Sequence, residues 1–333
     1  MITDWWGKFE SPNEAVGELR SPTKLVAALA SSVQERYERS SGKVFRELSE
    51  DVRSTAYLQL PEIFSRTALP STPQSFAPVP DVEMTIRARA SAVLAIGALG
   101  MESVSYGSEN DGELFVNLVV LPGEGRNVLK SKSGMRGHTD AVSFPFRGQV
   151  DPNNPSISPS PDFVCLSGLR NPDSVRTTIM PLNRVLEELS VDQIAELKKQ
   201  QFDIRSQKTF IEGMTLILGE EYTVEDAEIL LDVNGATWVR YSHSSIFVDE
   251  DVQPAAAGAN SAFVAACSKH CESVVIEPGD IVLVNNRLAL HGRTDVAGEP
   301  GGESRWILRT YGLETSTLTE AQRYAKPSYM LYP

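Results

Sequence analysis

The chain has 333 residues, of which 41% are hydrophobic and 23% charged, values typical of a globular protein with one large domain or two small ones. Its 31 basic and 44 acidic residues give a net charge of −13, which argues against nucleic acid or an anionic membrane surface as a partner. No run approaches the roughly 18 apolar residues of a membrane span. The three cysteines form no disulfide framework. The opening "MITDWWGKFESPNEAVGE" is acidic and lacks the pattern of a signal peptide, so we expect a cytoplasmic location.

The first hundred residues predict helices separated by one short strand. Residues from about 12 to 50 carry Leu, Val and Phe at helical spacing with long charged faces, and residues 83–100 predict a second good helix. Between them, "YLQLPEI" predicts a short strand, and "LPSTPQSFAPVPDV" is a Pro-rich loop within a domain. This region is therefore expected to form an N-terminal helical extension.

After Gly100 the pattern changes to short β-rich runs separated by Pro, Gly and Asn. The runs are "GELFVNLVVLP", "AVSFPF", "DFVCLSGL", "TTIMPL", "TWVRYSH", "VVIEPGDIVLVNN" and "RWILRTYGL". One helical insert, at about 182–202, interrupts them. Many short strands with turn signals are typical of a β-sandwich or jelly roll flanked by helices. The absence of a βαβ rhythm and of a G-x-G-x-x-G opening a helix excludes a Rossmann fold.

We therefore expect a mainly β fold with flanking helices, built on a double-stranded β-helix, or jelly roll. Residues 1–333 are predicted to form a single domain. Within it, 1–100 would be the N-terminal helical region, 101–315 the jelly-roll core with its helical insert, and 316–333 a C-terminal tail.

A candidate metal-binding motif lies in "KSKSGMRGHTDAVSFPF", where His138 and Asp140 are two residues apart. The pair alone carries little weight, because roughly half of all chains with this composition would contain one His-x-Asp/Glu. The chain in fact has a second, His270-Cys271-Glu272. The other residues near each pair must show which of the two, if either, belongs to a metal site.

A second histidine and two arginines accompany the first pair. His291 is predicted to end a near-continuous apolar strand in "PGDIVLVNNRLALHGRTD", and Arg305 and Arg309 follow in "SRWILRTYGL". The two-residue period of a strand places both arginines on one face, and likewise His138 and Asp140. Two imidazoles and one carboxylate form the facial triad of non-haem Fe(II) oxygenases. A keto acid would fill the open metal positions, and a guanidinium would bind its distal carboxylate.

Six motifs together resemble the clavaminate synthase-like branch of the Fe(II)/2-oxoglutarate-dependent oxygenases, in the TauD-like superfamily, over roughly residues 100–315. They are "GHTDAVSFPF", "PDFVCLSGLRNPD", "RTTIMPL", "WVRYSHS", "EPGDIVLVNNRLALHGRT" and "SRWILRTYGL". This branch includes hydroxylases of free amino acids. The resemblance implies that His138, Asp140 and His291 bind iron. It also implies that Arg305, with Thr178 or its neighbour Thr177, binds 2-oxoglutarate.

The resemblance also implies a substrate site. Arg309 would bind the α-carboxylate of an amino acid. Glu109, together with Ser133 or Ser131, matches places where relatives hold the backbone-type groups of the substrate.

One departure from the family pattern concerns the substrate's side chain. Relatives that bind a cationic side chain carry two carboxylates where this chain has Ser242 and Ser244. A buried cation would be poorly compensated by two hydroxyls. We therefore expect a neutral tail such as a ureido, amide or hydroxyl group. A lysine-like tail stays open if Glu109, Glu212 or another acid closes over it.

The expected function is hydroxylation of an unactivated C–H bond of an amino acid or derivative, with Fe(II), 2-oxoglutarate and O₂, in specialised metabolism such as antibiotic biosynthesis. Asp140 favours hydroxylation, because halogenating relatives replace this carboxylate with a small residue. Desaturation and ring closure use the same ligands. Two rival functions from different classes are a jelly-roll binding protein without catalysis and a zinc-dependent hydrolase. The oligomeric state and any carrier protein for the substrate are left open.

A second cluster, in "AACSKHCESVV", is interpreted as structural. Cys267, His270, Cys271 and Glu272 look like a fragment of a zinc site, but no second Cys/His pair stands at zinc-finger spacing. The preceding residues predict a helix whose C-terminal cations suit its dipole. His243 is likewise interpreted as a structural strand histidine.

Overall fold

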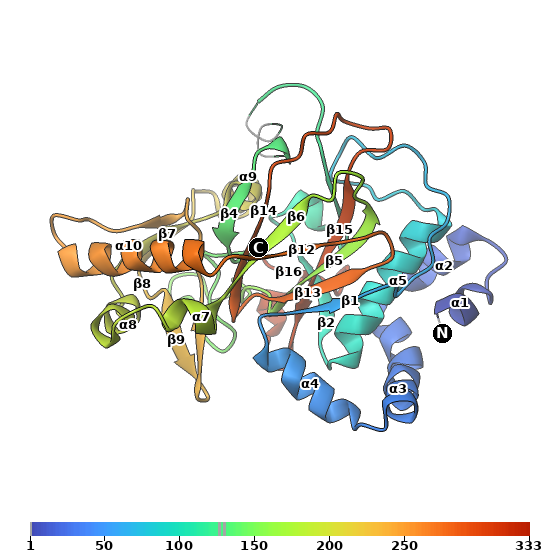
Figure 1. Ribbon diagram of the computed structural model, residues 1–333, viewed down its shortest axis with the longest axis horizontal. Coiled ribbons are helices and arrows are strands. Elements are labelled where there is room, and N and C mark those ends of the chain that lie inside the picture. The colour runs from blue at the N-terminus through green and yellow to red at the C-terminus, as the bar shows by residue number, and fades with distance from the viewer. Residues whose placement is uncertain (1, 126–127, 129–130) are drawn as a thin grey trace.

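The computed structural model describes residues 2–125, 128 and 131–333, and most of its strands belong to two antiparallel sheets (Figure 1). The larger sheet runs β1-β13-β5-β15-β2-β16, with β3 beside β15 and β16 parallel to β2. The smaller sheet runs β12-β6-β14-β4. The strands of the larger sheet are β1 (Tyr57–Leu60), β2 (Glu102–Tyr106), β3 (Val116–Val119), β5 (Phe163–Arg170), β13 (Ile281–Asn285), β15 (Trp306–Leu313) and β16 (Met330–Leu331); those of the smaller are β4 (Met135–His138), β6 (Arg176–Pro181), β12 (Glu272–Val275) and β14 (Ala289–Arg293).

The larger sheet is apolar on both faces because each face covers a separate core. In β15, Trp306 and Leu308 belong to the core under the N-terminal helices, whereas Ile307 belongs to the core on the opposite face. Successive strand residues point to opposite faces, so Arg305 and Arg309 fall on the same side as Ile307. The predicted placement of both arginines on one face agrees with this arrangement.

The N-terminal helices pack on the outer face of the larger sheet (Figure 1). They are α1 (Ile2–Trp6), α2 (Pro12–Leu19), α3 (Pro22–Ser41), α4 (Phe45–Ser54) and α5 (Glu83–Ala98). Prolines at the starts of α2 and α3 fit the first helical turn, and α3 ends at Gly42 in a left-handed conformation (φ 69°). α5 is buried nearly all round, and its two buried arginines form ion pairs, Arg87 with Glu83 at 2.8 Å and Arg89 with Asp81 at 2.6 Å. The predicted helices and the short strand of this region are confirmed.

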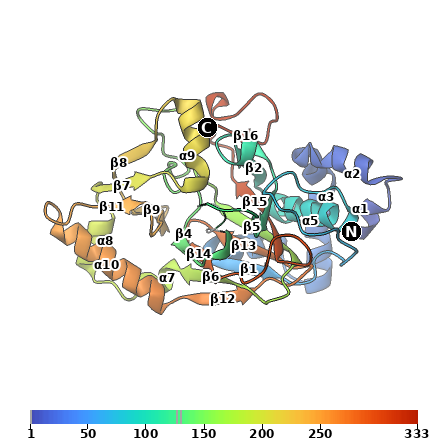
Figure 2. The ribbon, with the colours of Figure 1, turned by 90° about the horizontal axis from the view of Figure 1, so that it is seen from above.

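A lobe of helices and short strands lies at the opposite end of the molecule from α1–α3 (Figure 2). It contains α7 (Leu182–Leu186), α8 (Val191–Leu197), β7 (Phe202–Arg205), α9 (Lys208–Leu218), β8 (Thr223–Ala227), β9 (Leu230–Val233), β10 (Ala236–Val239), β11 (Ile246–Phe247) and α10 (Pro254–Lys269). The single helix predicted at 182–202 is wrong in its extent. Ser190 caps a new helix, accepting a hydrogen bond from the Gln193 amide at 3.2 Å, and β7 begins at Phe202.

Two further predictions about strands are wrong. The "AVSFPF" run (141–146) forms turns, beginning at Ala141 with a positive φ of 54°. The apolar run before His291 is broken at 286–288, and its two halves, β13 and β14, belong to different sheets. His291 therefore lies in the middle of β14 and not at a strand end. Among the described residues, no helix is long and apolar enough to cross a membrane.

Candidate functional site

His138 and His291 lie directly opposite one another on neighbouring strands. They are register partners in the β4–β14 pair, and their ring centroids are 4.5 Å apart. Each side chain is about nine-tenths buried. The Nδ1 atom of His138 lies 3.1 Å from the Arg136 carbonyl oxygen, which accepts only, so Nδ1 carries the proton and Nε2 is free to bind a metal.

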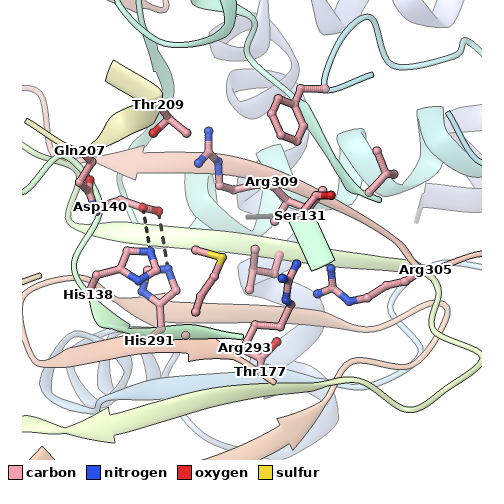
Figure 3. A pocket seen from close by; sticks show the side chains of 16 residues that line it. Ser131, His138, Asp140, Thr177, Gln207, Thr209, His291, Arg293, Arg305 and Arg309 are labelled. Atoms are coloured by element: carbon pink, nitrogen blue, oxygen red, sulfur yellow. Dashed lines mark ion pairs between the residues drawn. The ribbon is translucent and has the colours of Figure 1, made fainter. Parts of the chain in front are cut away.

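Asp140 completes the cluster from a turn that follows β4, so the prediction that it shares a strand face with His138 is wrong. Its Oδ1 is 3.5 Å from Nε2 of His138, and its Oδ2 is 3.7 Å from Nε2 of His291 (Figure 3). The three ligand atoms lie within 4.8 Å of one another, and this is the one such His/Cys/Asp/Glu group among the described residues. The structure thus places side by side the three side chains that the motifs predict as metal ligands.

The charges at the cluster suit a divalent metal. Burial acts to raise the pKa of Asp140, but His138, His291 and Arg309 outweigh it and hold that pKa well below its usual range. Burial, assisted by His138, lowers the pKa of His291 to about 4, so this imidazole is neutral at pH 7. Neither Oδ2 of Asp140 nor Nδ1 of His291 has a hydrogen-bond partner. Two imidazole nitrogens and one carboxylate oxygen are the donor set of a non-haem iron site.

Asn286, in the turn between β13 and β14, fixes the position of Asp140. Its side-chain oxygen accepts a hydrogen bond from the Asp140 amide at 2.8 Å. Its side-chain nitrogen donates to the carbonyl oxygens of Asp140, at 3.1 Å, and Pro161, at 3.0 Å. Asn286 was missed at the sequence level. The signal that could have found it is the polar pair "NN" inside an otherwise apolar run.

We expect Asn286→Ala to weaken Fe(II) binding by about 10- to 100-fold, as the loss of a partner that orients a metal ligand does. Asn171→Ala is the matched control, because Asn171 is also buried and makes three side-chain hydrogen bonds to backbone, to Val175 and Ile276. Both variants should lose similar thermal stability. Equal loss of Fe(II) affinity in both, measured by anaerobic titration, would contradict this positioning role.

A cavity of about 120 Å³ extends from the triad toward three arginines: Arg293, Arg305 and Arg309 (Figure 3). Arg305 immediately precedes β15 and is only 4% exposed. Its Nε has no hydrogen-bond partner, and no carboxylate among the described residues pairs with it. Burial, together with Arg293, lowers the pKa of Arg305 to about 9, which still leaves it charged at pH 7. A buried cation without a partner is costly unless a ligand supplies the anion.

Strand geometry separates the two predicted threonines. Thr177 pairs with Arg293 across β6–β14, shares the face of His291 and lines the cavity. Thr178 pairs with Gly292, and its side chain therefore points to the opposite face. Of the two candidates, Thr177 is the one placed to contact a ligand beside Arg305.

The two predicted serines also differ. Ser131 is buried and lines the cavity, but its hydroxyl already donates to the Val128 carbonyl at 2.7 Å and accepts from the Leu121 amide at 3.0 Å. Ser133 is exposed and does not line the cavity. Its carbonyl oxygen accepts a hydrogen bond from Arg293, a lining residue, at 2.6 Å.

Arg309 and Glu109 form a buried ion pair at 2.6 Å. The Tyr311 hydroxyl donates to the same carboxylate oxygen at 2.9 Å, and the other oxygen of Glu109 has no partner. Arg309 lines the cavity directly. Glu109 is buried and is not among the residues that line the cavity, so Arg309 is the member of the pair that a ligand in the cavity would contact first.

A second cavity, of about 350 Å³, adjoins the first and shares Met135, His138 and Gln207 with it. Ser242 and Ser244 line it, with their hydroxyl oxygens 3.3 Å apart. His243 also borders it, while Nδ1 of His243 is bonded to the Gly137 carbonyl oxygen at 2.6 Å. The predicted substrate serines therefore lie beside the triad.

Among the described residues, the cysteine-containing segment does not bring three potential metal-ligand atoms together. Cys267 is buried and Cys271 exposed. His270 pairs with Glu188 at 2.9 Å, and Lys269 binds the same carboxylate at 2.6 Å. The structural interpretation of this segment is consistent with these contacts.

Comparisons with known proteins agree with the site. Residues 231–311 match the model of the "Taurine catabolism dioxygenase TauD, TfdA family". The chain is 26% identical over 263 residues to the L-asparagine oxygenase of Streptomyces coelicolor, covering 77% of this chain and 72% of that protein. It is 25% identical over 212 residues to the L-lysine 3-hydroxylase of Catenulispora acidiphila, covering 62% of this chain. That match spans only 54% of the hydroxylase, about half its length.

The fold is also shared with a solved structure, the non-heme iron oxygenase OrfP in complex with Fe and alpha-ketoglutaric acid. The TM-score is 0.71 at 20% identity, over 99% of this chain and 95% of OrfP. The family match includes His291, Arg305 and Arg309, so it covers one half of the site described above. Together these similarities support a TauD-like Fe(II)/2-oxoglutarate-dependent oxygenase, the family that its motifs resemble.

Proposed function

We propose that this protein hydroxylates an unactivated C–H bond of an amino acid or amino-acid derivative. The observation that carries the proposal is the buried Arg305, which pairs with no carboxylate of the described residues, in the same cavity as the His138–Asp140–His291 cluster. A zinc hydrolase needs no dicarboxylate co-substrate, so that function would not explain why Arg305 is buried in this cavity. Relatives whose names specify L-lysine, L-asparagine and, for OrfP, hydroxylated L-Arg support an amino acid as the substrate class.

In this proposal His138, Asp140 and His291 hold Fe(II). Arg305 binds the distal carboxylate of 2-oxoglutarate through its planar fork, and Thr177 adds a hydroxyl to the same group. The two sheets that flank the cavity would form the jelly-roll core of one domain, with its strands as a rigid frame for these side chains.

Arg309 and Glu109 would bind the α-carboxylate and α-amine of the substrate. Arg309 exchanges part of its bond to Glu109 for the incoming carboxylate, while the free oxygen of Glu109 accepts from the amine. Tyr311 holds Glu109 in place by donating a hydrogen bond to it. These groups fix the substrate so that one C–H bond lies next to the metal site.

When bound, the iron lets O₂ oxidise 2-oxoglutarate to succinate and CO₂, with one oxygen atom inserted into the substrate C–H bond. The protein's own contribution is positioning and the exclusion of bulk water. Leu118, Val119 and Leu166 give the cavity apolar walls, which strengthen each contact to the arginines.

The test is turnover. Purified protein with Fe(II), 2-oxoglutarate, O₂ and a panel of L-amino acids should release succinate and a product 16 Da heavier, in equal amounts. Both products should disappear when O₂ or 2-oxoglutarate is omitted. Product formation without either co-substrate would favour hydrolysis, and no succinate with any amino acid, together with no binding of 2-oxoglutarate, would reject the proposal.

A further inference from the structure

The cavity beside Ser242 and Ser244 is rich in positive charge. Its charged side chains are three cations, Arg136, Arg205 and Lys208, and one acid, Glu221. This excess stands out in a chain with 44 acidic and 31 basic residues. The cations come from three different elements, β4, β7 and the start of α9, and the fold brings them together at one cavity.

None of these three cations forms an ion pair with any described residue. Exposed cations elsewhere commonly do: Lys198 pairs with Asp232 at 2.7 Å, and Lys199 with Glu196 at 2.5 Å. Arg205 is held over the Phe247 ring at 4.1 Å, and Arg136 donates weakly to the His243 carbonyl oxygen at 3.4 Å. Both guanidinium groups are therefore positioned but keep their charge uncompensated.

The N-terminus of α9 adds donors to the same cavity, since Gln207, Lys208 and Ile211 line it. No side chain caps this helix, and its first turn contains no acid. The Gln207 side chain donates to the Thr139 carbonyl oxygen at 3.0 Å instead of capping. An uncapped helix start presents free N–H groups and a partial positive charge, which favour an anion.

We infer that the substrate's side chain ends in a fixed negative charge, such as a carboxylate or phosphate, which this cavity binds. The inference rests on the proposed function. Arg309 and Glu109 take the amino-acid end of the substrate, and the cavity on which Ser242 and Ser244 open takes the far end. Two serines explain why a cationic tail is disfavoured, and the three cations further favour an anion over a neutral group.

The experiment is an anaerobic titration of the protein loaded with Fe(II) and 2-oxoglutarate, in which amino acids perturb the charge-transfer band of the chelate. The probes are length-matched: L-glutamate against L-glutamine, and L-2-aminoadipate against L-lysine, with O-phospho-L-serine to separate phosphate from carboxylate. The best anionic probe should bind at least about fivefold more tightly than its neutral or cationic match, the factor of one exposed ion pair. Added salt should reduce this advantage.

Charge reversal tests the side chains. Arg205→Glu and Lys208→Glu should each weaken the binding of the anionic probe by about fivefold or more. Lys43→Glu makes the same charge change on an exposed lysine of the N-terminal region and should leave the binding unchanged. All three variants should bind 2-oxoglutarate like the parent.

Two failures are distinguishable. A normal band that anionic probes do not perturb, or that neutral or cationic probes perturb at lower concentration, overturns the inference and leaves the cofactor site intact. Absence of the band overturns the proposed function, and the inference with it.

Discussion

Replacing Arg305 with alanine is expected to raise the Kd for 2-oxoglutarate by at least about 30-fold, because truncating one partner of a buried charge pair costs about 2–5 kcal/mol. Arg305 is buried and pairs with no carboxylate among the described residues, so its charge is free to bind an incoming dicarboxylate. Fe(II) binding should stay close to that of the parent, since Arg305 is not part of the His138–Asp140–His291 cluster. The measurement is the 2-oxoglutarate dependence of the charge-transfer band.

Arg305→Lys separates charge from geometry. It keeps a positive charge but loses the planar fork, so we expect an intermediate Kd. Arg184→Ala, on an exposed arginine of α7 that pairs with Glu187, is the control for a lost arginine elsewhere. An unchanged Kd for 2-oxoglutarate in Arg305→Ala would mean that another cation, Arg293 first, holds the distal carboxylate.

The members of the His138–Asp140–His291 cluster could be proposed from the sequence because residue chemistry is local information. A His-x-Asp, a distant His and a following Arg can be read directly along the chain, and the apolar strands around them follow from composition. The register that sets His138 opposite His291 cannot be read that way, because pairing of β4 with β14 depends on the whole smaller sheet. The motif nevertheless brought both residues to one site.

Errors arose where a single residue decides the face or the turn. Thr177 and Thr178 are adjacent in β6, so their side chains point to opposite faces of the sheet. A shift of one residue in the strand register would exchange which of them faces the cavity, and only the pairing of Thr177 with Arg293 shows that it is Thr177. Asp140 was assigned to a strand because period two gave the right neighbours, yet the carboxylate reaches the histidines from a turn held by Asn286. The turn between β13 and β14, which contains Asn286, was missed as well, because the pair Asn285-Asn286 barely interrupts an otherwise apolar run.

The cationic cavity was beyond sequence reasoning for a different reason. Arg136 lies far along the chain from Arg205 and Lys208, and only the fold of the lobe brings the three together. The helix α9, which carries Lys208, was not predicted at all. From the sequence, Ser242 and Ser244 argued against a cationic tail and led us to expect a neutral one, whereas the cations around them favour an anionic tail. The charge around them came from the fold.

The second large effect is expected at the metal cluster itself: His291→Ala should abolish stoichiometric Fe(II) binding. Losing a ligand removes more than the roughly 10- to 100-fold in affinity that an outer partner contributes. It also leaves Asp140, an ionised and buried carboxylate, with one fewer neighbour to satisfy it. His270→Ala is the matched control, because it removes an imidazole that pairs with Glu188 outside the cluster. Anaerobic Fe(II) titration followed by separation of free metal gives the bound stoichiometry. Retention of one tightly bound iron by His291→Ala, with the fold intact, would show that the His138–Asp140–His291 cluster is not the metal site.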